Sequence, residues 1–145
     1  MTKRMTLAVL ALLGTLLAAY LTLHDMGIIG TLACGSGDCE IVQTSRWSML
    51  FGVHVAVWGV AYYALIFVVA MAAAQEQFAA DRRLSLALVG LTGWGVIFSG
   101  WLTYLELFRI HAICRWCVGS ASIVAVLFVL SVLDFRDQPR PVIGE

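Results

Sequence analysis

Four apolar stretches without a single Asp, Glu, Lys or Arg dominate the chain, and they cover residues 5–23, 47–75, 84–105 and 116–133. A helix needs about 20 residues to cross the hydrocarbon core of a bilayer, so each stretch has roughly the length of one membrane span. The second stretch is longer than a span requires, so we expect part of it to lie in the interface. The fourth is slightly short, which favours an extension back through Ala112 and Ile113, with Arg115 reaching the surface.

Small residues indicate how these spans pack, because they recur along residues 52–64 and 90–100 and permit close helix contacts. We expect helices at about 5–23, 50–74, 84–108 and 116–133. The fold predicted is an all-α integral membrane protein, a four-transmembrane-helix bundle that forms one domain over residues 1–133. Residues 134–145, with two prolines, are expected to be a disordered cytoplasmic tail. The first span resembles a signal sequence, but its length favours a retained helix.

The loop between the first two spans carries an amphipathic pattern of its own. Apolar and small residues share one helical face there, namely Ile41, Val42, Ser45, Met49 and Leu50. This spacing predicts a short interfacial helix in the first outer loop, anchored by Trp47.

Composition strengthens the membrane assignment and excludes one class of partner. Hydrophobic residues make up 61% of the 145 positions and charged residues 12%, whereas soluble domains have about 45–50% and about 25%. The formal net charge is zero, so there is no basic face for nucleic acid.

Basic residues near the span ends predict the orientation in the membrane. With the N-terminus in the cytoplasm, the inner side has six basic residues and the outer side three; the six are Lys3, Arg4, Arg82, Arg83, Arg136 and Arg140, and the three are Arg46, Arg109 and Arg115. We therefore expect both termini in the cytoplasm and a location in the inner (plasma) membrane. The cysteine pairs then lie on the extracytoplasmic side, where disulfides form.

Four cysteines form two close pairs, Cys34/Cys39 and Cys114/Cys117. The second pair is a CxxC sequence at the start of the last span. Unpaired N–H groups and the macrodipole at a helix start stabilise a thiolate. We expect a lowered pKa for Cys114 and expect it to be the more exposed cysteine of its pair.

A dithiol at the edge of the membrane can react with a quinone, because a quinone is lipid-soluble and accepts two electrons. Aromatic residues near the outer leaflet offer contact surface for it: Trp47, Phe51, Trp58, Trp101 and Phe108. Thiolate attack on a disulfide sulfur allows the loop pair to exchange with a soluble protein and with the CxxC pair. The residues thus suggest a relay from a partner protein through the two pairs to quinone.

Three polar residues near the outer span ends have alternative roles. His54 and His111 are interfacial or solvated in the simplest interpretation, and hydrogen-bonding to a ligand or supporting a thiolate are the functional alternatives. Glu106 is expected to pair with Arg109 or to contact water, with catalysis as the less favoured alternative.

Three alternatives compete with a redox relay. Four thiolates can hold structural zinc, although two membrane spans separate the pairs. The cysteines can pass a thiophilic ion through a channel, although the spans lack charge. They can also form purely structural disulfides in a non-catalytic membrane protein.

The order of these features resembles the vitamin K epoxide reductase (VKOR) family, in its bacterial branch. A loop cysteine pair follows the first span, then come Thr44-Ser45-Arg46-Trp47, Phe51-Gly52, and Gly59 with Tyr62, and a CxxC opens the last span. The likeness covers nearly the whole chain. Other four-helix quinone reductases with two cysteine pairs place their CxxC in the first outer loop instead.

The resemblance implies roles for individual residues. Cys114 and Cys117 would be the active-site pair, with Cys117 nearest the quinone, and Cys34 and Cys39 the shuttle pair. Ser45 would hydrogen-bond near the active site, and Trp47, Phe51, His54, Trp58 and His111 are our candidates for quinone contacts. The cofactor implied is ubiquinone or menaquinone. The partner implied is a thioredoxin-like extracytoplasmic protein, and because the chain ends at Glu145, we expect it to be separate.

Two departures from the family pattern concern the ligand. Many relatives have Pro-Asn where this chain has His54-Val55. The asparagine can hydrogen-bond the quinone in those relatives, so a different residue must do so here, with His54 and His111 as the candidates. Vertebrate members have a tyrosine where this chain has Ala121, which favours plain quinone reduction over epoxide reduction.

Overall fold

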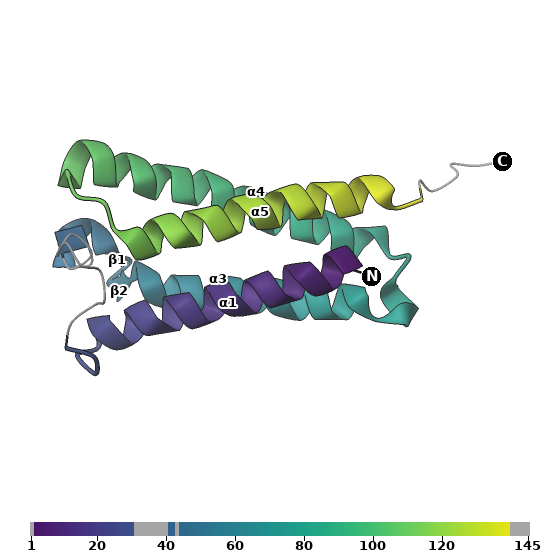
Figure 1. The fold of residues 1–145 in the computed structure, drawn as a ribbon, viewed down its shortest axis with the longest axis horizontal. Coiled ribbons are helices and arrows are strands. Elements are labelled where there is room, and N and C mark those ends of the chain that lie inside the picture. The colour runs from purple at the N-terminus through teal and green to yellow at the C-terminus, as the bar shows by residue number, and fades with distance from the viewer. Residues whose placement is uncertain (1, 31–40, 43, 140–145) are drawn as a thin grey trace.

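The computed structural model describes residues 2–30, 41–42 and 44–139, and these form an elongated bundle of four long helices (Figure 1). They are α1 (Thr2–Asp25), α3 (Val55–Ala74), α4 (Arg82–Leu105) and α5 (Arg115–Asp137). Successive long helices run in opposite directions, and both ends of the described chain lie at the same end of the bundle. We call this the terminal end, and the opposite end, where α5 begins, the cysteine end. The predicted all-α four-helix bundle is confirmed.

One short connection joins α3 to α4 at the terminal end of the bundle. A 3₁₀ turn, η2 (Glu76–Phe78), follows α3, and Asp81 then caps α4 by accepting a hydrogen bond from the Arg83 N–H at 2.9 Å. Such a cap satisfies one of the N–H groups left unpaired at a helix start.

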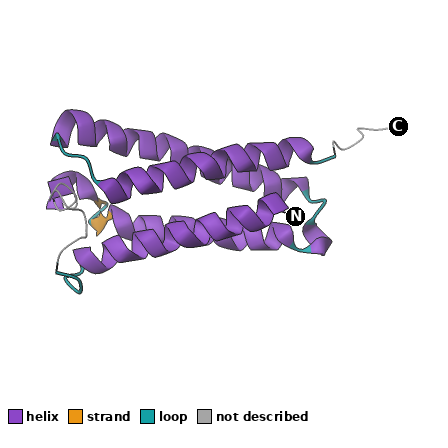
Figure 2. Cartoon of the chain, in the orientation of Figure 1, coloured by secondary structure: helices purple, strands orange, loops and turns teal. Residues whose placement is uncertain are grey.

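A β-hairpin stands at the cysteine end, where the sequence suggested helix (Figure 2). Ile41, Val42 and Thr44 are helical and η1 (Arg46–Ser48) is a 3₁₀ turn. Strands β1 (Met49–Leu50) and β2 (Val53–His54) then pair antiparallel. The predicted interfacial helix is therefore wrong in including Met49 and Leu50, and the second span begins at Val55 rather than near residue 50.

Backbone conformation explains this difference. Phe51 and Gly52 both have positive φ, 53° and 79°, which is the signature of a two-residue type I′ hairpin turn. Positive φ is natural for glycine but uncommon for a bulky residue. The turn is therefore hard to predict from a Phe-Gly pair.

The core is centred on α1 and α3, which approach each other through small residues. Its fully buried members include Leu7, Ala8, Ala11, Ile66, Ala70 and Ala73. Gly14 on α1 faces the ring of Tyr63, so that a Cβ at this position would collide with the ring. Tyr63 in turn donates to the Ser120 backbone oxygen at 3.0 Å, which links α3 to α5.

A buried ion pair closes the terminal end of the bundle. Arg4 on α1 lies 3.1 Å from the carboxylate of Asp134 on α5, and both residues are buried. This contact corrects the predicted start of the tail, because α5 continues to Asp137 and Asp134 belongs to the folded bundle. The fourth span lengthens here, and not through Ala112 and Ile113, which precede the helix.

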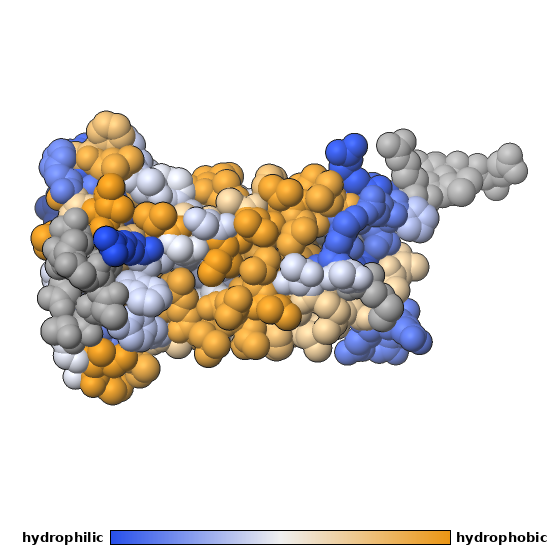
Figure 3. Space-filling model, viewed as in Figure 1, coloured by the Kyte–Doolittle hydropathy of each residue, from blue (hydrophilic) through white to orange (hydrophobic). Residues whose placement is uncertain are grey.

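Exposed side chains are apolar around the middle of the bundle. Figure 3 shows hydrophobic residues over the middle of the visible face and hydrophilic residues gathered at the terminal end. Large exposed apolar residues occur on all four helices, among them Leu16, Val68, Ile97 and Val129. Within the described residues, four helices are long and apolar enough to cross a membrane, so this is a multi-pass membrane protein.

Candidate active site

The CxxC pair lies where α5 begins, as the sequence predicted. Cys114 is the N-cap residue, with an extended backbone at φ −87° and ψ 117°, and Cys117 lies in the first turn. The two side chains are thiols that hydrogen-bond to each other. A disulfide between them needs only removal of two protons and two electrons.

Exposure of the two cysteines is the reverse of our expectation. Cys114 is 0% exposed and packs with Leu21, Val42 and Ala112, whereas Cys117 is half-buried. The short segment before α5 folds inwards and carries Cys114 with it. Cys117 is thus the cysteine open to a small molecule, and Cys114 is buried in a cluster that includes Val42.

An unusual turn before this segment directs Glu106 at the cysteines. The end of α4 widens into a π-helix, η3 (Glu106–Ile110), and His111 ends it in the left-handed region at φ 56°. The Ala112 N–H then donates back to the Glu106 backbone oxygen at 3.1 Å. The chain therefore reverses tightly, and Glu106 ends up beside the start of α5.

Glu106 is a site residue to which our sequence interpretation gave too little weight. Its side chain is only 5% exposed, its Oε2 accepts a hydrogen bond from the Cys114 N–H at 3.3 Å, and it hydrogen-bonds to the Cys117 side chain. Arg109, its expected ion-pair partner, is exposed on the surface. The available signal was an acidic residue at the end of an apolar span, eight positions before Cys114.

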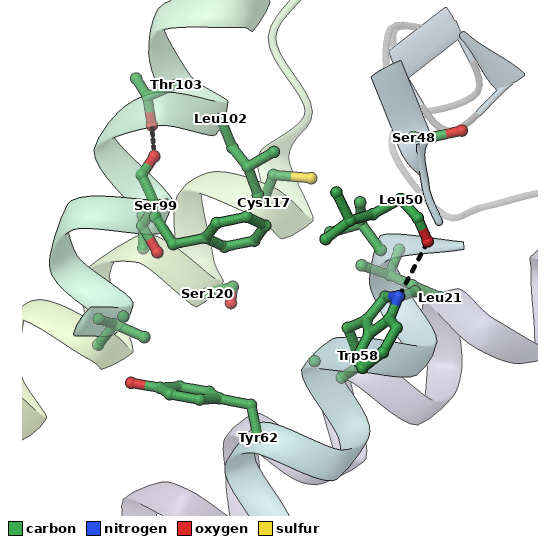
Figure 4. Close-up of a pocket in the computed structure, with 18 of the residues that line it drawn as sticks. Leu21, Ser48, Leu50, Trp58, Tyr62, Ser99, Leu102, Thr103, Cys117 and Ser120 are labelled. Carbon is green, nitrogen blue, oxygen red and sulfur yellow. Dashed lines mark hydrogen bonds between the residues drawn. The ribbon is translucent and has the colours of Figure 1, made fainter. Parts of the chain in front are cut away.

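A cavity of about 420 Å³ opens beside Cys117 (Figure 4). Its wall comes from all four long helices and from the segment before α3, and it is mostly apolar. Cys117, Glu106 and Ser120 are among the polar groups that line it. The cavity is half-open, and its wall includes the exposed rings of Trp58 on α3 and Trp94 on α4. It therefore faces the side of the bundle, where lipid lies around a membrane protein.

Tyr62 separates the cavity from the middle of the bundle. The Tyr62 hydroxyl donates to the Leu91 backbone oxygen at 2.8 Å and lies directly over Gly95, where any Cβ would collide with it. Figure 4 shows the Tyr62 ring on the side of the cavity away from Cys117. Tyr62 of α3 can therefore hydrogen-bond to α4 only because Gly95 has no side chain.

Two of the predicted quinone contacts, Trp47 and Trp58, line this cavity, and so does Ser45, which was predicted to hydrogen-bond near the active site. The Ser45 hydroxyl donates to the Val42 backbone oxygen at 2.7 Å, and the Trp58 indole donates to the Leu50 oxygen at 3.1 Å. The first bond holds the turn that follows Val42, and the second holds β1 against the start of α3. Phe51 is 89% exposed at the hairpin tip, with its ring edge-on to Trp58, and is not part of the cavity wall.

Neither predicted histidine lies at the cavity. His111 is exposed in the turn before α5. His54 lies 3.5 Å from the buried carboxylate of Asp25, which His24 approaches to 3.6 Å. This cluster borders a second hollow on the other side of Ser45, so His54 joins the end of α1 to the start of α3.

Cys34 and Cys39 lie outside the described residues, so the structure gives no geometry for the predicted shuttle pair. Val42, which packs against Cys114, follows Cys39 by three positions. Among the described residues, no group of three or more His, Cys, Asp or Glu side chains is arranged to hold a metal ion.

Comparison with known families gives one finding. The model of the vitamin K epoxide reductase family matches residues 5–132. The match runs from the second turn of α1 almost to the end of α5 and includes both cysteine pairs.

Proposed function

The chain belongs to the vitamin K epoxide reductase family, whose members are membrane thiol–disulfide oxidoreductases, and we propose that it passes electrons from thiols to a quinone. In this proposal it reoxidises a separate thioredoxin-like protein, which supports disulfide formation in exported proteins. The observation that carries the proposal is the position of Cys117 in the wall of an apolar, laterally open cavity.

The cavity fits a quinone headgroup in size and chemistry. Its volume of about 420 Å³ falls in the range of about 300–1,000 Å³ that is usual for small-molecule sites. A few polar side chains stand among many apolar ones, including Ser45, Ser99 and Ser120, and hydroxyl groups are suited to orient quinone carbonyls. Ubiquinone and menaquinone are both candidates for this site.

A bound quinone would accept two electrons and two protons. The protein contributes the two thiols and the apolar wall around them. Cys117 presents its thiol to the cavity, and Cys114 stands behind it at the buried N-cap position. Closing the Cys114–Cys117 disulfide releases two electrons into the cavity. The apolar wall keeps water away from the reacting sulfur.

Electrons would enter the CxxC pair from Cys34 and Cys39. Cys34 would face the partner protein, and Cys39 would exchange with Cys114 through thiolate attack on a disulfide sulfur. The support is the packing of Val42, close to Cys39 in sequence, against Cys114. Because Cys114 is buried, this exchange requires the packing around Cys114 to open.

The proposed orientation places the cysteine end outside the cytoplasm of a plasma (inner) membrane. Lys3, Arg82 and Arg136 lie near helix termini at the terminal end, and an excess of basic residues marks the cytoplasmic side. Arg4 contributes less to this excess of basic charge, because its guanidinium is paired with Asp134 inside the bundle.

The decisive experiment is quinone reduction by the purified protein in detergent, with dithiothreitol as donor and ubiquinone and menaquinone analogues as acceptors. We expect turnover that disappears in Cys117→Ala but persists in Ser122→Ala, a matched small substitution at an exposed position of the same helix. Comparison of the two analogues identifies the preferred quinone. Absence of turnover in folded, fully reduced protein would reject the proposal, as would full activity of Cys117→Ala.

A further inference from the structure

We propose that Glu106 is a catalytic residue that carries the thiol protons from the CxxC pair into the cavity. This inference rests on the proposed function and deepens it. Glu106 touches both the start of α5 and the wall of the cavity, so it connects the sulfur atoms with the acceptor.

The geometry places one carboxylate within reach of both cysteines. Its Oε2 accepts the Cys114 N–H at 3.3 Å, and the carboxylate also accepts a hydrogen bond from the Cys117 thiol. Cys117 hydrogen-bonds to Cys114 as well. The three side chains therefore form a continuous path for a proton from Cys114 through Cys117 to Glu106.

Within the described part of the chain, this carboxylate has no counter-charge. Glu106 takes part in none of the ion pairs formed within residues 2–30, 41–42 and 44–139, and Arg109 and His111 on its own turn are exposed. The groups that act on it are Cys114 and Cys117. A buried charge without a partner is unfavourable, so a carboxylate held here gains by taking up a proton.

A purely structural role explains less. Holding the Cys114 N–H requires only an oxygen acceptor, which glutamine supplies equally well. An acid differs from an amide only in its ability to exchange protons, and its second contact is with the reacting sulfur of Cys117. The rare π-helix that begins at Glu106 is also a feature that recurs at functional sites.

Oxidation of the CxxC pair to a disulfide releases two protons and two electrons. The S–H bond of Cys117 breaks and its proton moves to the Glu106 carboxylate, which hands it on into the cavity. The proton of Cys114 follows along the same path, and an S–S bond forms between the two sulfurs. The two electrons released go to the quinone together with the two protons, giving the hydroquinone, and Glu106 ends as the carboxylate that it was at the start.

The first test is chemical rescue of quinone reduction. We expect both Glu106→Gln and Glu106→Ala to lower kcat by about a hundredfold or more, the range typical of a lost general acid–base group. Formate should restore Glu106→Ala, because the cavity leads to the vacated space, and should not restore Glu106→Gln, whose amide fills it. Rescue by formamide as effective as rescue by formate would show that only the Cys114 N–H needs a partner, and would overturn the proposal.

The second test measures Cys117 itself and needs no quinone. Trypsin cuts after Arg115, so Cys114 and Cys117 fall on different peptides and the iodoacetamide reaction of each is measured separately in reduced protein. In wild type we expect Cys117 alkylation to rise with pH in coupled steps, because the carboxyl and both thiols share protons. Glu106→Gln should lose the step that the carboxyl contributes and keep only the coupling between the two thiols, whereas Glu106→Asp, which keeps a carboxylate, should retain that step.

Controls keep the outcomes distinct. Glu76→Gln is the same substitution at an exposed position at the terminal end and should change neither kcat nor the alkylation profile. If wild-type protein fails to reduce quinone, the proposed function is wrong, whatever the role of Glu106. If wild-type protein reduces quinone but Glu106→Gln has the same alkylation profile as wild type, only the proposed role of Glu106 is wrong.

Discussion

Arg4 and Asp134 form a buried ion pair although 130 positions separate them in the chain. The Arg4 guanidinium also donates to the Ser85 hydroxyl at 3.1 Å and to the backbone oxygen of Ala73. One side chain of α1 therefore binds α3, α4 and α5 together at the terminal end. With the helices fixed there, the cysteine end can remain open enough to hold a cavity between α3 and α4.

Asp134→Ala should strongly destabilise the protein, because it leaves the Arg4 charge buried without its partner. Loss of one member of a buried ion pair typically costs about 3–5 kcal/mol. The measurement is thermal unfolding in detergent. Asp137→Ala is the matched control, since Asp137 pairs with Lys3 at the exposed surface, where ion pairs contribute about 1 kcal/mol or less. Equal effects of the two substitutions would contradict a dominant role of the Arg4 cluster.

Gly95→Ala should weaken quinone binding while leaving the cysteines intact. The new Cβ would collide with the Tyr62 hydroxyl, so the ring must leave its hydrogen bond to Leu91 and move into the cavity. We expect KM for quinone to rise about tenfold, with the alkylation rate of Cys117 unchanged.

Gly90→Ala is the control for this prediction. Gly90 also lies on α4, but nothing lies within 4 Å of the position that its Cβ would occupy. The substitution should therefore leave KM at the wild-type value. If Gly95→Ala behaves like Gly90→Ala, the ligand does not occupy the cavity next to Tyr62.

The long helices and the position of the CxxC pair were predictable from the sequence. Uninterrupted apolar stretches are a direct requirement of the hydrocarbon core, and a CxxC at the polar edge of such a stretch must lie near a helix start. The packing faces were not predictable, because lipid-facing residues such as Leu16 and core residues such as Leu7 are equally apolar. Only the structure separates them.

The parts of the site that sequence could not predict depend on backbone geometry. His111 and Phe51 both adopt positive φ, although neither is glycine, and both turns follow from packing of the surrounding chain. The first brings Glu106 back onto Cys114, and the second replaces a predicted helix with a hairpin. The exposure of Cys114 was misjudged for the same reason, since it depends on how the turn folds inwards.

Cys34→Ala should separate the two halves of the proposed relay. Dithiothreitol is small and can reduce the CxxC pair directly through Cys117, which is half-buried in the cavity wall, so quinone reduction with this donor should remain within about twofold of wild type. A reduced thioredoxin-like protein is too large to reach Cys114, which is fully buried, and should lose its activity as a donor. The measurement is quinone reduction with each donor in turn, with Cys117→Ala as the variant inactive with both. Undiminished electron transfer from the protein donor in Cys34→Ala would show that the partner attacks another cysteine, and the proposed order of the relay would then be wrong.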